Sequence, residues 1–174
     1  LARLQAGDVA GAREAADRAL SRVRTNAPVQ FYLGPACAEL AEVHLALWEA
    51  AADAEASRRK PLAESAREAC SVLSGFAKLV HYARPAAYRS RGLAAWLEGD
   101  AKLAHSLWKK ALAEAERLEM RYETARAHLE IGRHLEGSER AAHLDKAIPI
   151  FTDLGATADA RHAREEQRSS APRR

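Results

Sequence analysis

The sequence predicts an all-α protein made of stacked antiparallel helix pairs, and three observations support this prediction. Of the 174 residues, 48% are hydrophobic and only 6% are aromatic. The hydrophobic residues are rich in Ala and Leu and poor in β-branched types, which favours packed helices over sheet. They recur at helical spacing along most of the chain. Two Gly-Asp pairs, Gly7-Asp8 and Gly99-Asp100, each separate two helical patterns.

The clearest helix pair surrounds Gly99 and Asp100. Gly99 can adopt the left-handed conformation that ends a helix, and Asp100 can cap the free amides of the next helix, so the chain reverses in two residues. We expect Gly92 and Ala104 to face each other where the two helices cross, and Ala111 to let a further hairpin approach closely. Because one hairpin cannot bury both its faces, neighbouring hairpins are required.

The spacing of small and aromatic residues in this stretch is similar to that of the tetratricopeptide repeat. The residues that carry the resemblance are Tyr88, Gly92, Gly99, Asp100, Ala104, Ala111 and Leu112. The resemblance implies an α-solenoid of antiparallel helix pairs with a right-handed superhelix, which acts as a binding scaffold. It also implies that the first helix of each hairpin lines a concave groove.

We expect residues 1–168 to form one such repeat domain, followed by a disordered tail at 169–174. The hairpins are expected at about 1–24, 28–82, 85–119 and 121–154, with a final helix at 156–168. We expect the first hairpin to be truncated, because Gly7-Asp8 repeats the corner at Gly99-Asp100 and only a short helix end precedes it.

Proline and glycine set the remaining boundaries. In the second hairpin, Pro28 opens a helix, Gly34-Pro35 breaks or kinks it, and Pro61 opens the partner helix. The third hairpin begins at Arg84-Pro85. In the fourth, Pro149 removes one amide and should bend the second helix.

Three stretches in the C-terminal half of the chain indicate a more specific resemblance. Residues 92–112, 122–135 and 148–156 are similar to the C-terminal repeats of large bacterial signalling ATPases of the AAA or STAND type. In those proteins a protein-kinase or nucleotide-cyclase domain precedes the ATPase. The resemblance implies a regulatory or sensory repeat region within a multidomain parent. From the start at Leu1 rather than Met, we expect the chain to be an excised piece or a processed product.

The composition indicates in which cellular compartment the chain resides and which kinds of partner it lacks. The only two cysteines, Cys37 and Cys70, suit a reducing cytoplasm in which both are free buried thiols. No run approaches the ~20 apolar residues of a membrane span, so we expect no membrane contact. A net charge of +3 is too weak to argue for nucleic acid.

Sequence signatures of catalysis are missing. There is no Gly-Lys-Ser/Thr loop and no Gly-x-Gly-x-x-Gly motif. None of the histidines, His128, His134 and His143 included, has a spacing that brings two metal ligands onto one helical face. We therefore expect no enzymatic activity, no cofactor and no metal site.

The predicted partner-binding groove combines arginines with apolar side chains. Its residues are Arg89, Leu93, Trp96 and Leu97 in the third hairpin and Arg126, Leu129, Arg133 and Glu136 in the fourth. Three arginines near an exposed Trp would hold an acidic or aromatic peptide, because guanidinium groups pair carboxylates bidentately and stack on rings. The alternative is that the Trp belongs to the core and the arginines form a solvated face.

Three other kinds of partner stay open. A small-molecule effector would suit a repeat domain of a transcription-regulator-type ATPase, and it needs a closed pocket with convergent polar groups. Nucleic acid would have to bind the C-terminal arginines, where no aromatic residues interleave, so only weak attraction is expected. Finally, an uncapped N-terminal repeat exposes apolar surface through which two copies could form a homodimer.

Overall fold

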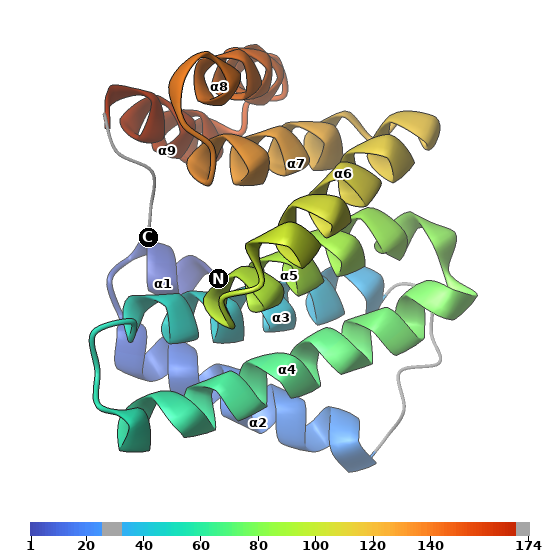
Figure 1. The fold of residues 1–174 in the computed structure, drawn as a ribbon. Helices are drawn as coiled ribbons and strands as arrows, with labels where there is room; N and C mark the ends of the chain where they lie inside the picture. Colours follow the sequence, from blue (N-terminus) through green and yellow to red (C-terminus); the bar gives the residue numbers. More distant parts are fainter. Residues whose placement is uncertain (26–32, 170–174) are drawn as a thin grey trace. The chain divides into compact units, whose positions relative to one another are not determined.

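The computed structural model describes residues 1–25 and 33–169, which are helical and contain no strand (Figure 1). This confirms the all-α class. The helices are α1 (Ala2–Gln5), α2 (Val9–Thr25), α3 (Gly34–Ala50), α4 (Ala56–Leu79), the 3-10 turn η2 (His81–Ala83), α5 (Arg84–Leu97), α6 (Ala101–Arg117), α7 (Arg121–Arg133), α8 (Gly137–Asp153) and α9 (Thr157–Arg168). They form two compact units, Leu1–Ala104 and His105–Arg174, with α6 running from one into the other.

The chain reverses through the same backbone motif at both Gly-Asp pairs. The amide of Gly7 donates to the Leu4 carbonyl at 3.0 Å and the amide of Asp8 to the Arg3 carbonyl at 2.9 Å. Gly99 donates in the same way to the carbonyl three residues back, and Asp100 to the carbonyl five residues back, both at 2.9 Å. These paired bonds satisfy carbonyls at the helix end and require a positive φ at the glycine, 81° at Gly7 and 90° at Gly99.

Each corner aspartate then caps the following helix. Oδ1 of Asp8 accepts a hydrogen bond from the amide of Gly11, and Oδ1 of Asp100 accepts one from the amide of Leu103, both at 2.9 Å. The acceptor stands at the N-cap position and the donor at the third helical residue, which is the preferred capping geometry. The predicted corner, with its glycine stop and aspartate start, is confirmed at both places.

Two further corners have the same helix-ending bonds without a Gly-Asp pair. Glu119 and Gly155 donate to the carbonyls three residues back at 3.1 Å, and the residues that follow them donate to carbonyls five residues back at 2.9 Å. Gly155 has φ of 67°, whereas Glu119 is a non-glycine residue at φ of 55°. A side chain at such a φ is strained, so this corner stores a small conformational cost.

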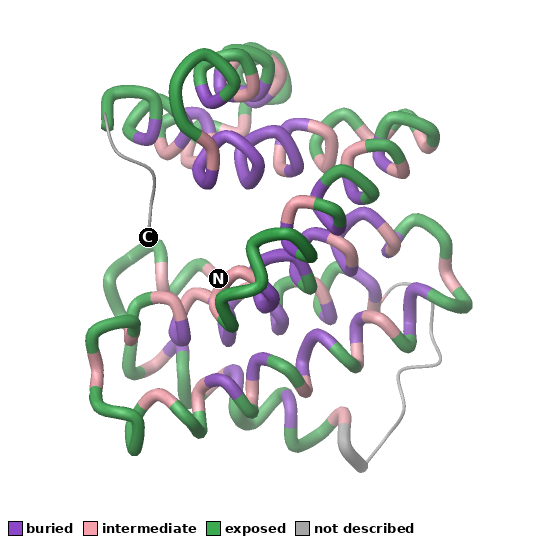
Figure 2. The backbone as a smooth tube through the Cα atoms, in the orientation of Figure 1, coloured by how far each residue is buried: buried purple, intermediate pink, exposed green. Residues whose placement is uncertain are grey.

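In the first unit, α3 lies at the centre and packs against α2, α4 and α5. It is buried on most sides because apolar residues surround its axis, and Figure 2 shows buried positions along it. Large buried side chains of this unit include Leu45, Trp48, Leu73, Phe76 and His44. Small residues allow the helices to approach, and Ala41, Ala66 and Ala69 have no exposed surface.

The second unit has its own core between α7, α8 and α9. Its buried residues are Ala125, Leu129, Leu144, Ala147, Phe151, Ala160 and Ala163. A Cβ at Gly132 would lie 2.9 Å from Cγ of Leu144 and 3.4 Å from the carbonyl oxygen of Arg140. Gly132 is therefore the point at which α7 and α8 come close together.

The proline predictions had mixed outcomes. α5 begins at Arg84 as expected, and α3 begins at Gly34 with its proline in the first turn. The expected helix start at Pro61 is wrong, because α4 begins at Ala56 and the proline lies inside it. The backbone amides of Arg58 and Arg59 donate hydrogen bonds to the Glu55 carbonyl oxygen and so form the first turn ahead of the proline. The expected start at 28 and the tail at 170–174 lie outside the described residues.

Candidate functional site

The predicted groove residues of the first unit all lie on α5, where Arg89 is buried rather than solvated. Arg89 is 4% exposed, and its Nη2 donates to Oε1 of Glu42 on α3 at 2.6 Å. Leu93 is buried, while Trp96 and Leu97 are half-buried. A charge at this depth is held by its partner, because an unpaired buried charge is costly.

Arg126 of the second unit joins α7 to α9. Its Nη1 donates to the hydroxyl oxygen of Tyr122 at 3.1 Å and lies 3.6 Å from Oδ1 of Asp159. The Tyr122 hydroxyl donates to Oδ2 of the same aspartate at 3.2 Å. The Arg126 guanidinium also lies 5.8 Å from the centroid of the Tyr122 ring, within cation–π range. These contacts hold a half-buried arginine against its own fold.

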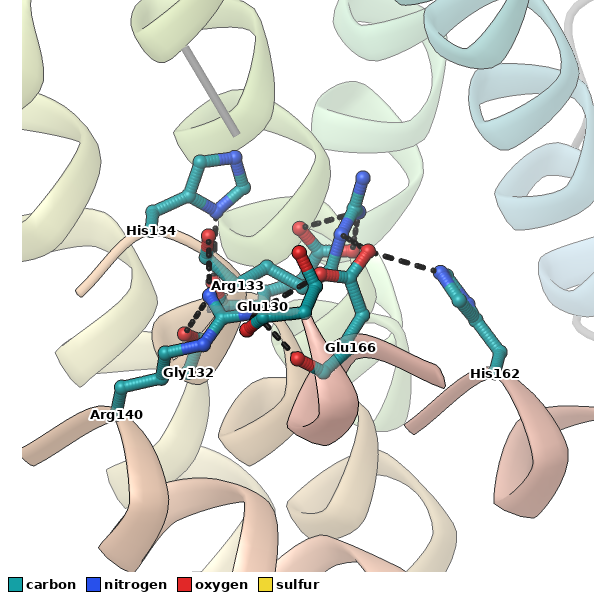
Figure 3. A network of polar contacts seen from close by, with 8 residues as sticks. Glu130, Gly132, Arg133, His134, Arg140, His162 and Glu166 are labelled. Atoms are coloured by element: carbon teal, nitrogen blue, oxygen red, sulfur yellow. Dashed lines mark hydrogen bonds and ion pairs between the residues drawn. The ribbon is translucent and has the colours of Figure 1, made fainter. Parts of the chain in front are cut away.

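Arg133 belongs to a buried group of four charges, Glu130, Arg133, Arg140 and Glu166, which we call the four-charge cluster (Figure 3). Nη1 of Arg133 donates to both carboxylate oxygens of Glu130, at 3.2 and 3.3 Å. Its Nε lies 3.6 Å from Oε1 of Glu166 on α9. Two positive and two negative side chains balance, so the cluster is neutral as a whole.

Arg140 closes the C-terminal end of α7. Its Nη1 donates to the carbonyl oxygens of Gly132 at 3.1 Å and Arg133 at 3.2 Å, which are the last two carbonyls of that helix. Its Nη2 donates to both the backbone carbonyl and Oε2 of Glu166. A cation at a helix C-terminus is favourable because the backbone carbonyls carry partial negative charge there. Arg140 thus links α7, α8 and α9.

The remaining predicted positions differ in exposure. Leu129 is part of the second-unit core, and Glu136 is exposed at the N-cap position of α8. The eight predicted residues therefore divide between the two units, four on α5 and four in or just after α7. A single groove formed from both sets stays a prediction. Arg89 and Arg133 are buried and form ion pairs. They are therefore neither exposed groove residues free to bind a peptide nor part of a solvated face.

His128 and His143, which the sequence analysis weighed only as metal ligands, form a hydrogen-bonded pair that joins α7 to α8. Nδ1 of His128 lies 2.9 Å from Nδ1 of His143, so one ring donates and the other accepts. Burial, then the neighbouring His143 and Lys146, lowers the pKa of His128 to about 4. Burial and Lys146 also lower the pKa of His143. The fifteen-residue separation gave no signal, because it depends on how two helices are aligned.

Both cysteines are free and buried, as predicted. Burial raises the pKa of the Cys70 thiol to about 12, which keeps it protonated at neutral pH. In the described parts of the chain, no three His, Cys, Asp or Glu side chains converge as metal ligands would. No helix among the described residues is long and apolar enough to cross a membrane.

Comparison of the chain with protein-family models, with curated proteins and with solved structures found no match. The fold of the described residues defines the chain as an all-α protein.

Proposed function

We propose that this chain is a non-catalytic protein-interaction scaffold, built as a tetratricopeptide-like right-handed α-solenoid. In this proposal it forms the regulatory or sensory repeat region of a multidomain bacterial signalling ATPase. Its partner is a protein or peptide, or another domain of the parent chain. The observation that carries the proposal is the repeated corner, in which Gly7-Asp8 and Gly99-Asp100 make the same helix-ending and helix-capping bonds. Repeated hairpins of this kind form extended binding surfaces.

Packing within each unit supports stacked hairpins. In such a stack, each first helix contacts its own hairpin partner and also the first helix of the next hairpin. α3 packs against α4 and also against α5, and α8 packs against both α7 and α9. Taking α3 and α5 as first helices, the contacts of the first unit follow this scheme, and in the second unit α8 packs against its partner α7 and against the next helix α9.

The groove arginines support the same scheme in an unexpected way. Arg89 on α5 reaches Glu42 on α3, and Arg133 on α7 reaches Glu166 on α9. Arg126 likewise joins α7 to α9 through Asp159. Each arginine therefore bridges from one first helix to another, which would fix the spacing of successive hairpins. Partner contacts in the proposed groove then fall mainly to the more exposed positions beside these bridges.

The experiment compares partner capture by the full native chain and by two double variants. The groove variant is Trp96→Ala with Glu136→Lys, at predicted groove positions that are half-buried and exposed. The matched control is Leu103→Ala with Glu116→Lys on α6, a second helix, where both side chains are exposed. Both variants remove one apolar side chain and reverse one charge. The buried arginines are left intact, because replacing them would break ion pairs that hold the fold.

The proposal predicts that the groove variant loses a cytosolic partner that the native chain and the control variant both retain. Circular dichroism must show unchanged helicity for all three proteins. Equal capture by folded groove and control variants would refute binding through the groove. A native chain that retains no protein above a denatured reference would refute the scaffold proposal itself.

A second candidate function is effector sensing, in which the repeat domain of a transcription-regulator-type ATPase binds a small molecule. A cavity of about 430 Å³ in the first unit favours it, because small-molecule sites have volumes of roughly 300–1,000 Å³. Ligand-induced thermal stabilisation of the chain would support this candidate, since a ligand that binds only the folded state raises the unfolding temperature.

A further inference from the structure

The 430 Å³ cavity lies between the last turns of α4 and the first turns of α5. Its polar lining consists of Ser74 and Lys78 from α4 and of Arg84, Tyr88 and Arg91 from α5, with two alanines between them. The α4 residues are spaced by four, and the α5 residues by four and three, so each set forms one helical face. The cavity is thus the space between two helical faces of the same compact unit.

Among the described residues that line this cavity, the charged ones are Lys78, Arg84 and Arg91, which are all cations, and none is a carboxylate. Several exposed arginines of the first unit have acidic partners, namely Arg3, Arg13, Arg18 and Arg67, the last with Glu98 at 2.6 Å. Lys78 and Arg91, in contrast, have no ion pair with any carboxylate of residues 1–25 and 33–169. Like charges gathered around a concave surface focus the electrostatic potential and attract an anion.

Two hydrogen bonds fix part of the lining. Nε of Arg84 donates to the carbonyl oxygen of Ala77 at 3.4 Å, which holds this guanidinium against the end of α4. Oγ of Ser74 donates to the carbonyl oxygen of Cys70 at 2.7 Å. Because its proton is used in that bond, Ser74 faces the cavity as a hydrogen-bond acceptor, which suits a ligand hydroxyl. The Tyr88 ring adds a half-buried aromatic surface.

We propose that this cavity binds a small organic anion with a charge of about −2 or more, carried by a phosphate group or by neighbouring carboxylates. Arg91 and Lys78 supply the principal contacts to the anionic group, because a guanidinium fork and an ammonium both pair such oxygens strongly. Tyr88 packs against the organic part. The inference deepens the effector-sensing candidate and rests on it, and it is independent of the scaffold proposal.

The test measures binding to the full chain by calorimetry at physiological ionic strength. The probes are pyrophosphate, adenosine monophosphate, citrate and the neutral control adenosine. The cavity variant is Lys78→Gln with Arg91→Gln, and the matched control is Lys109→Gln with Lys110→Gln, which removes two exposed cations from α6. Arg84 is kept because its bond to Ala77 supports the fold. Circular dichroism verifies that both variants are folded.

We expect adenosine monophosphate or citrate to bind the native and control proteins, and to bind the cavity variant about tenfold or more weakly. Comparing the phosphate probes, pyrophosphate and adenosine monophosphate, with the carboxylate probe, citrate, shows which anionic group the cavity binds. For a phosphate ligand, Tyr88→Leu should weaken adenosine monophosphate but not pyrophosphate, since only the former has a ring to pack.

Equal weakening in the cavity and control variants would overturn the inference, because it would show a response to net charge alone. Adenosine binding as tightly as the anions would overturn the anionic class while leaving effector sensing in place. If neither the anions nor adenosine bind at millimolar concentration, both the inference and this reading of the cavity as an effector site fail.

Discussion

The hydrogen bond between His128 and His143 makes the α7–α8 pair sensitive to acid. It requires that one Nδ1 carry a proton and the other not, so the bond is lost when both rings are protonated. Two cations that face this site, Lys146 on α8 and Lys109 on α6, oppose protonation of His143, while Glu139 on α8 favours it. Lowering the pH should therefore destabilise this hairpin.

The size of the effect follows from the pKa of His128. Its folded value of about 4 lies below the ordinary 6.5, so the unfolded chain binds more protons between these two values. The stabilisation is fully present above pH 6.5 and is lost as the pH falls toward 4. At 1.36 kcal/mol for each unit of pKa difference, His128 alone accounts for roughly 3 kcal/mol, and His143 shifts in the same direction.

The assay is urea unfolding of the native chain and of His128→Asn at several pH values. The asparagine amide can replace the Nδ1 hydrogen bond but does not titrate in this range. Between about pH 7 and pH 4, the free energy of unfolding of the native chain should fall by roughly 2–3 kcal/mol more than that of the variant. Parallel pH profiles for the two proteins, or a His128 pKa near 6.5 measured by NMR, would refute the reasoning.

Three other predictions concern the corners, the four-charge cluster and a thiol. Gly99→Ala should lower the free energy of unfolding by about 1–2 kcal/mol because φ is 90° at this position. Glu119→Gly, at φ of 55°, should raise the free energy of unfolding by up to about 1 kcal/mol. Chemical denaturation measures both changes, and changes of the same sign would contradict the assignment of positive φ to these corners. Glu166→Gln leaves two buried arginines against one carboxylate and should cost about 3–5 kcal/mol, whereas a change within about 0.5 kcal/mol would show that the cluster contributes little. The Cys70 thiol should react with a disulfide reagent at least tenfold more slowly in the native chain than in urea, and equal rates would contradict its burial.

Local signals in the sequence predicted the helix pairs well. Gly99 and Asp100 specify a helix end and a helix start through backbone bonds within a few residues, so the sequence contains all that is needed. The boundary at 119 was expected, but the positive φ of Glu119 was not, because a non-glycine residue adopts that conformation only where the surrounding packed structure imposes it. The prediction that Pro61 begins a helix was wrong because the exposed early turns of α4 tolerate a residue that has no amide hydrogen.

The state of the groove arginines depends on residues far along the chain. The partner of Arg89 lies 47 residues away, and it is brought near only when α3 and α5 pack. Arg133 has one signal in the sequence, Glu130 three residues earlier on the same helix, which indicates an ion pair but not its burial. Glu166 and Arg140 gave no signal, because their roles follow from the way α8 and α9 close over the end of α7.

Hydrogen exchange of the full chain, with and without its captured partner, tests the scaffold proposal most directly. Binding in the proposed groove should slow amide exchange in the first helices, at Arg84–Leu97 and Arg121–Arg133. Exchange in the second helices, Ala101–Arg117 and Gly137–Asp153, should change little. Protection confined to those second helices would place the partner on the opposite face and contradict the proposal.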